Sequence, residues 1–387
     1  MGGSDTDAYG LDDGLNDGLD DGLDDDLGHG AEDDRGPHVR RRLASGRPGR
    51  RPRAYRVLRA VLVVGLVVVL VLVGSIWFLT HRYAGTVARL PGVFSALDPA
   101  LRPPPPPLGP TGQAPLTFLV VGTDSGQTPP TVQPGGPVGD AEAGSDVLML
   151  VQIAGDRQSV QVVAIPTLSF VPIPGYPDGQ IANAFALGGP TLTVQTVEAL
   201  THVRIDHFAQ LEVSGFREVT DALGGVDVPI AEAGQFAGVT FTRGLNHLDG
   251  RGALAYLRQP RPVPADSFFR MQRVQNFLRA VVTTVSRENL LVQPGRLDDF
   301  LLALSSSLSV DDELSDGDLA TLIVSLRHLD QSDIDFVTAP VTGTGTEGGR
   351  PAVYLDENAA DQMWSYLNDG SLQRHLGEFP RLPRVPR

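Results

Sequence analysis

The chain has 387 residues, with 46 acidic and 31 basic side chains, 8 histidines and no cysteine, and every basic residue is an arginine. The absence of cysteine excludes disulfides, thiolate nucleophiles and cysteine-ligated metal sites. The absence of lysine excludes P-loop and Schiff-base chemistry. The formal net charge of −15 argues against a partner that is a nucleic acid.

Charge is strongly segregated near the N-terminus. Residues 1–34 hold 13 acidic side chains and no basic one, with a leucine at every fourth position from Leu11 to Leu27, and residues 35–59 hold 10 arginines and no acidic side chain. Aspartate and glycine are poor helix formers, and like charges repel one another. We therefore predict a disordered tail over residues 1–59. An acidic partner-binding segment over residues 1–34 is the alternative.

Residues 60–79 form an uncharged apolar run, AVLVVGLVVVLVLVGSIWFL. Twenty helical residues span ~30 Å, which matches the hydrocarbon core of a membrane. The arginine cluster precedes the run, while only Arg82 and Arg89 follow it closely. The positive-inside rule then predicts a single-pass transmembrane helix with a cytoplasmic N-terminus and an extracytoplasmic C-terminal domain.

The stretch after the apolar run is rich in proline. Pro103 to Pro107 are consecutive, and Pro99, Pro110 and Pro115 surround them. Such a sequence favours a semi-rigid polyproline spacer. We predict a stalk and linker over residues 80–113, a folded domain over 114–370 and a C-terminal tail over 371–387.

The folded part has an α/β pattern. Apolar runs typical of buried strands and amphipathic runs typical of helices alternate along it. The sequence predicts Ser214 as a helix cap, Gly224 as a helix stop and Pro190 near a helix start. The predicted strands cover 116–124, 145–153, 159–166, 207–213 and 333–341, and the predicted helices cover 189–201, 214–225, 250–258, 267–285, 295–308, 315–329 and 357–369. One mixed sheet with helices on both faces is the economical fold.

Several of these segments, in this order, resemble a known family. They are SDVLMLVQI (145–153), RIDHFAQLEVSGFREVTDALGGVDVPI (204–230) and GLNHLDGRGALAYLR (244–258). Together they are similar to the LytR-CpsA-Psr domain of bacterial envelope proteins. The resemblance implies an α/β/α sandwich tethered outside the cell membrane. It also implies a phosphotransferase that moves a glycopolymer from a polyprenyl pyrophosphate carrier to a peptidoglycan hydroxyl, with magnesium as cofactor.

The resemblance also implies roles for individual residues. Asp124 and Asp146 match positions that bind magnesium, and Asp146, Arg258 and Arg270 match the catalytic set. Arg273 and Arg261 would contact the phosphates, and the apolar residues Phe185, Val197, Phe277 and Val281 would line a pocket for the isoprenoid. Each type of residue has an ordinary alternative: a turn or cap for aspartate, a solvated surface for arginine and a plain hydrophobic core for the apolar residues.

The chain departs from the family at its anion-binding motifs. Thr167 and Leu168 stand where the family has arginine and aspartate, and Val274 replaces a glutamine. Pro260 also interrupts an Arg-x-Arg pair, so that Arg261 falls one residue late. Arginine forms charged, bidentate contacts that threonine cannot replace. We therefore expect reduced transfer activity.

Three functions remain open at this stage. The first is an envelope phosphotransferase with a modified anion site. The second is a non-catalytic relative that binds polyprenyl-linked intermediates or serves as a scaffold. The third is a membrane-bound transcriptional regulator, which the predicted topology disfavours because the folded domain would lie across the membrane from DNA.

Overall fold

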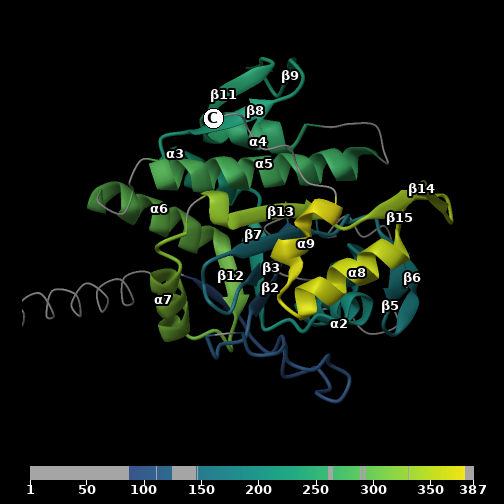
Figure 1. Cartoon of the computed structure of the whole chain (residues 1–387). Helices are drawn as coiled ribbons and strands as arrows, with labels where there is room; N and C mark the ends of the chain where they lie inside the picture. Colours follow the sequence, from purple (N-terminus) through teal and green to yellow (C-terminus); the bar gives the residue numbers. More distant parts are fainter. Residues whose placement is uncertain are drawn as a thin grey trace, which may run out of the picture. The chain divides into compact units, whose positions relative to one another are not determined.

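The computed structural model describes residues 87–109, 111–123, 145, 147–259, 265–287, 290, 293–329 and 331–379. Within these ranges, the centre is a mixed sheet of seven strands in the order β1-β12-β7-β2-β3-β4-β13 (Figure 1). Strand β2 pairs parallel with β7 and antiparallel with β3. The strands are β1 (Ala88–Leu90), β2 (Leu116–Thr123), β3 (Val147–Ile153), β4 (Val160–Ala164), β7 (His207–Glu212), β12 (Leu308–Asp311) and β13 (Ile334–Thr338).

Helices cover both faces of this sheet, and each face has its own hydrophobic core. Side chains alternate along β2: Phe118 packs into the first core, whereas Leu119 and Val121 pack into the second. The first core is covered by α3 (Gly215–Ala222), α4 (Gly250–Leu257), α5 (Ala265–Arg287), α6 (Pro294–Ser307) and α7 (Asp316–Ser325). The second is covered by α2 (Asn183–Thr201), α8 (Glu357–Asn368) and α9 (Leu372–His375). The predicted α/β/α sandwich is confirmed.

Four two-stranded antiparallel sheets and two short 3-10 turns complete the described elements. These small sheets were not predicted because their strands are short and carry many polar side chains or glycines. They are β5 (Phe170–Ile173) with β6 (Tyr176–Gln180), β8 (Val226–Ile230) with β11 (Gly244–Leu248), β9 (Gly234–Phe236) with β10 (Val239–Phe241), and β14 (Val341–Glu347) with β15 (Arg350–Leu355). The turns are η2 (Gln331–Asp333) and η3 (Leu376–Glu378).

The predicted helix ends are partly correct. Gly224 follows α3 with a φ of +77°, a left-handed conformation that suits glycine and ends the helix. Ser214 precedes α3, but its side chain makes no capping bond and instead lies 3.3 Å from a carboxylate oxygen of Glu212. Pro190 lies inside α2, directly after a kink at Gly188 and Gly189. It therefore begins the second segment of that helix rather than the helix as a whole.

The folded domain begins earlier than the predicted boundary at residue 114. β1 pairs in parallel with β12 at the edge of the central sheet, and Val93, Phe94 and Leu97 are buried in the second core. The proline-rich stretch also contacts the domain, since an Arg204 Nη1 donates to the carbonyl of Pro103 at 3.0 Å. The prediction of a stalk is therefore wrong for residues 87–109. Short buried segments between prolines carry too little periodicity to be recognised from sequence.

Arg102 joins this early segment to the domain. Its guanidinium lies 2.8 Å from a carboxylate oxygen of Glu198, a side chain that is only 5% exposed. It also donates to the carbonyl of Ile205 and lies over the ring of Phe94. A buried carboxylate that loses its cation is strongly destabilising.

We expect Arg102→Ala to lower the free energy of unfolding by about 3–5 kcal/mol, because Glu198 would keep a buried negative charge without its partner. Denaturant unfolding of the full chain in detergent measures the change. Arg204→Ala is the matched control, because that arginine gives one hydrogen bond to a neutral carbonyl and should cost about 1 kcal/mol. Equal losses in the two variants would contradict the role given to Arg102.

The domain also ends later than predicted. Leu372, Leu376 and Phe379 are buried in the second core, and the first two belong to α9 and η3. The predicted tail is therefore wrong for residues 371–379. These three residues recur at spacings of four and three, which was a readable helical signal within a segment that is otherwise polar.

The described helices include none that is long and apolar enough to cross a membrane. The predicted transmembrane run at residues 60–79, and the charged segments before it, lie outside the described residues.

Candidate functional site

A cavity of about 330 Å³ opens beside the first core. Its walls combine apolar side chains with two arginines, and no acidic side chain lines it among the described residues. The lining residues are Val147, Val213, Phe216, Phe236, Leu257, Arg258, Arg270 and Val274. Such a site suits a ligand with an apolar body and an anionic end.

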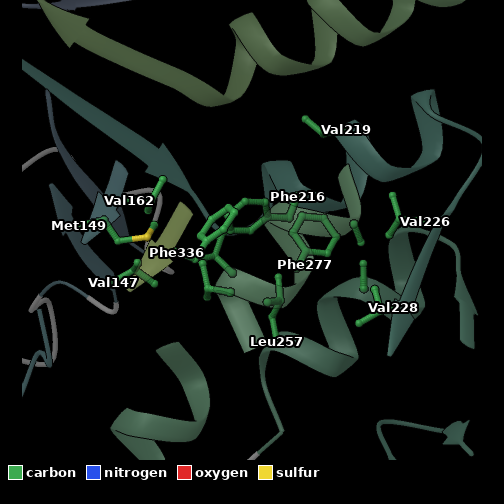
Figure 2. Packing of buried hydrophobic residues seen from close by; sticks show 14 of the residues in the cluster. Val147, Met149, Val162, Phe216, Val219, Val226, Val228, Leu257, Phe277 and Phe336 are labelled. Carbon is green, nitrogen blue, oxygen red and sulfur yellow. The ribbon is translucent and has the colours of Figure 1, made fainter. Parts of the chain in front are cut away.

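The cavity residues come from five elements, β3, α3, β9, α4 with its C-cap, and α5, and from the residue that follows β7. Val147 begins β3, and Phe216 lies in the first turn of α3. Val213 follows β7, and its amide donates to the carbonyl of Thr123 at 2.9 Å, which fixes the end of β7 beside the end of β2. Phe236 ends β9. The side chains of Val147, Phe216 and Leu257 point into the same region of the first core (Figure 2).

Arg258 and Arg270 approach the cavity from two different helices. Arg258 is the C-cap of α4, where its amide donates to the carbonyl of Leu254 at 3.0 Å, and its side chain is exposed. Arg270 lies on α5 and is half-buried, one turn before Val274. Two guanidinium groups at one cavity can bind phosphate oxygens from two sides. The structure thus brings these two predicted residues together.

Arg273 has a different place. It is 7% exposed, and its Nη2 donates to the carbonyl of Gln259 at 2.7 Å. It does not line the cavity. The contact holds the segment that follows α4, and with it Arg258, against α5. The expectation that Arg273 contacts phosphate has no support from this geometry, which instead indicates a positioning role.

Tyr256 lies in the same region and remains protonated at neutral pH. Burial in α4 raises the pKa of its hydroxyl, and the hydrogen bond to Asn276 and the charge of Arg273 only partly oppose that rise. Tyr256 can therefore donate a proton in a hydrogen bond but carries no charge next to the arginines.

The four apolar candidates fall on opposite faces of the sheet. Phe277 packs in the first core, with its ring edge-on to that of Phe216 at 5.1 Å between centroids, and Val281 packs against the same core. Phe185 and Val197 are buried in the second core. The structure therefore brings Phe277 against the cavity residue Phe216 and places Val281 on the same face of the sheet, whereas Phe185 and Val197 lie on the other face. Sequence periodicity cannot tell which face of a sheet a helix will cover.

The two predicted metal ligands, Asp124 and Asp146, lie outside the described residues. Their described neighbours lie at one edge of the sheet: β2 ends at Thr123, β3 begins at Val147, and the register pairs Gly122 with Val147. Ser145 is 4% exposed, and its hydroxyl has no hydrogen-bond partner among the described residues. Those residues also contain no group of three or more carboxylates or histidines able to hold a metal ion.

The described positions that depart from the family motif, Thr167, Leu168 and Val274, lie near the same edge. Thr167 follows β4 and accepts a hydrogen bond at its carbonyl from the amide of Ala182, whose own carbonyl faces the amide of Ser145 at 3.4 Å. Leu168 accepts at its carbonyl from the amide of Val353. Val274 is buried and lines the cavity. Pro260 and Arg261 lie outside the described residues.

Phe236 and Phe216 were missed by the sequence analysis. Phe236 lies at the end of a three-residue strand, before a turn in which Ala237 and Gly238 both have positive φ. An Arg251 Nη2 donates to the carbonyl of Ala237 at 3.2 Å and ties this turn to α4. The Ala-Gly pair was the only local signal for the turn, and it is weak without two longer flanking strands.

Comparisons with known proteins agree with this fold. The model of the LytR_cpsA_psr family matches residues 102–369. Solved structures with the same fold include B. subtilis TagV, with a TM-score of 0.53, 22% identity and coverage of 69% of this chain and 98% of the other. The LytR-Csp2A-Psr enzyme from Actinomyces oris gives a TM-score of 0.52 at 19% identity, with coverage of 73% and 96%.

Curated relatives extend the comparison to named proteins. The probable cell wall biosynthesis protein LcpB of Corynebacterium glutamicum is 28% identical over 256 residues, which are 65% of this chain and 60% of the relative. The polyisoprenyl-teichoic acid–peptidoglycan teichoic acid transferase TagU of Halalkalibacterium halodurans is 30% identical over 207 residues, which are 53% and 63%. The chain thus spans less than two thirds of these relatives. Because the family model covers most of the chain and includes the cavity, the chain belongs to the LytR-CpsA-Psr family.

Proposed function

We propose that this chain is an extracytoplasmic envelope transferase, anchored by residues 60–79, which takes a glycopolymer from a polyprenyl pyrophosphate carrier and attaches it to peptidoglycan. The observation that carries the proposal is the apolar cavity whose lining includes both Arg258 and Arg270. The apolar part of the cavity wall suits the polyprenyl chain of a lipid-linked phosphate, and the two arginines suit its phosphate group. The relatives named for cell wall biosynthesis and teichoic acid transfer support the same class of reaction.

The proposed reaction breaks the phosphoanhydride bond of the polyprenyl pyrophosphate and forms a phosphodiester between the glycopolymer and peptidoglycan. A hydroxyl oxygen of peptidoglycan forms a bond to the phosphorus next to the glycopolymer, and the bond from that phosphorus to the polyprenyl phosphate breaks. The hydroxyl proton passes to solvent water, and polyprenyl phosphate departs as the leaving group. Arg258 and Arg270 would bind the phosphate oxygens and stabilise the negative charge that develops on the leaving group.

Magnesium remains part of the proposal through Asp124 and Asp146. Two carboxylates suit a hard cation, and the unpartnered hydroxyl of Ser145 lies next in sequence to Asp146. A bound magnesium would neutralise charge on the pyrophosphate. The described neighbours of the two aspartates lie at the sheet edge that borders the cavity, which is where such an ion would be needed.

A cavity-filling substitution tests the proposal. We expect Val274→Phe to weaken binding of a polyprenyl phosphate by about tenfold, because displacing about two buried methylenes costs ~1.6 kcal/mol. Binding is measured by titration of the full chain in detergent. Leu319→Phe is the matched control, since Leu319 packs against the same core from α7 but does not line the cavity.

A Val274→Phe protein that binds the long-chain lipid as well as the parent would contradict the proposed site.

The second candidate function, a non-catalytic binder, is favoured by the threonine and leucine at positions 167 and 168. Binding without any transfer to peptidoglycan would support that candidate.

A further inference from the structure

The cavity lies at one end of the strands of the central sheet, which is a different place from its edge strands. β2 and β7 both end there, since Thr123 pairs with Glu212, and β3 begins there at Val147. The cavity residues Val147 and Val213 belong to this boundary. The start of α3 and the end of α6 meet at the same place, because a Cβ on Gly215 would lie only 2.0 Å from the hydroxyl of Ser307. We refer to this side of the domain as the cavity edge.

The N-terminal segment joins the sheet from the cavity edge. Ala88 of β1 pairs with Ser309 of β12, and Ser309 pairs in turn with Gln210 near the end of β7. At the other end of β1, Leu90 is linked to Asp311, whose carboxylate accepts a hydrogen bond from the amide of Phe208 near the start of β7. β1 therefore begins at the cavity edge and runs away from it.

The distances along this edge are short. β1 and β3 are separated by β12, β7 and β2, so that four strand spacings of ~4.8 Å place them about 19 Å apart across the sheet. Residues 80–87, which connect the apolar run at 60–79 to β1, span roughly 28 Å even when fully extended. With residues 60–79 in a membrane, as proposed above, the start of β1 would lie within that distance of it.

We propose that the cavity edge faces the lipid bilayer, an inference that rests on the membrane anchor in the proposed function. The opposite edge is about 20 Å farther along the strands, by the rise of the seven-residue β3. If that opposite edge faced the membrane, residues 80–87 would have to run nearly straight along the side of the sheet to reach the start of β1. With the cavity edge toward the bilayer, a polyprenyl chain passes from the bilayer into the cavity with little apolar surface exposed to water, and such exposure is unfavourable.

The absence of cysteine allows a direct test with single-cysteine variants of the full chain. Ser214→Cys places a label on an exposed residue at the cavity edge. Gln158→Cys and Glu313→Cys place labels on exposed residues at the opposite edge, beyond the paired ends of β3 and β4 and beyond the end of β12. Neither of these two residues lines the cavity.

Each labelled protein is reconstituted into vesicles of phosphatidylcholine and phosphatidylglycerol that contain a lipid with a fluorescence-quenching head group. The inference predicts that quenching is stronger at position 214 than at both 158 and 313. Equal quenching at the three positions, or stronger quenching at 158 or 313, would overturn it. Failure of the protein to float with the vesicles would remove the anchor and overturn it as well.

This readout is independent of catalysis. Proteins that show the expected order of quenching but transfer no glycopolymer would leave the orientation standing and contradict only the proposed transfer. Proteins that are active but show the reverse order would contradict only the orientation.

Discussion

Arg270→Ala is expected to lower kcat for glycopolymer transfer by about 10²–10³, the usual effect of removing one preorganised donor that stabilises transition-state charge. Arg270 is half-buried in the wall of the cavity, where a charged contact is screened less than on an open surface. Its loss should change kcat more than the affinity for the lipid, because the apolar walls remain. Turnover of a polyprenyl pyrophosphate substrate by the full chain, with magnesium present, gives both values.

The matched control for Arg270 is Arg327→Ala. Arg327 is an exposed arginine after α7 that donates to a carbonyl of its own turn and does not line the cavity. Its replacement should leave turnover within twofold of the parent. If Arg270→Ala retained full turnover, the cavity would not be the site of phosphoryl transfer.

The double substitution Thr167→Arg with Leu168→Asp is expected to raise turnover by roughly 10–10² while changing lipid affinity much less. The new guanidinium would supply a charge-assisted contact near the sheet edge where Asp124 and Asp146 are expected, and such contacts are worth most when transition-state charge develops. The aspartate is included because the family motif pairs it with the arginine. Steady-state kinetics on parent and variant provide the comparison.

The outcome for this variant distinguishes two views of the chain. A gain in kcat with little change in KM would support an anion site weakened by Thr167 and Leu168. No gain, with a parent that already turns over as fast as a relative with the complete arginine set, would show that another residue such as Arg261 fills the role. Adding Pro260→Arg tests whether the proline redirects the chain beyond Arg258.

The central strands were predictable because burial on both faces leaves a continuous apolar run. β2, β3 and β4 each appear in the sequence as such a run. β1 and β12 were not recognised, because each has only three or four residues at one side of the sheet, and their pairing depends on partners more than 200 residues away. Local pattern carries no information about such distant pairing.

The candidate site shows a similar division. Arg258 and Arg270 were found through motif position, and the cavity brings them together although they come from different helices. Phe185 was assigned to the same pocket by family position and helical spacing, yet it packs on the other side of the sheet. Hydrophobicity predicts that a residue is buried, whereas the face on which it is buried depends on the path of the whole chain.

The most direct test of the site is the affinity of the full chain for polyprenyl phosphate compared with the neutral polyprenol of the same length. If Arg258 and Arg270 bind the phosphate at the end of an apolar cavity, the charged lipid should bind at least about tenfold more tightly, since one charge-assisted hydrogen bond contributes ~1.5–3 kcal/mol. Equal affinity for the two lipids would contradict the assignment of this cavity as a site for lipid-linked phosphate.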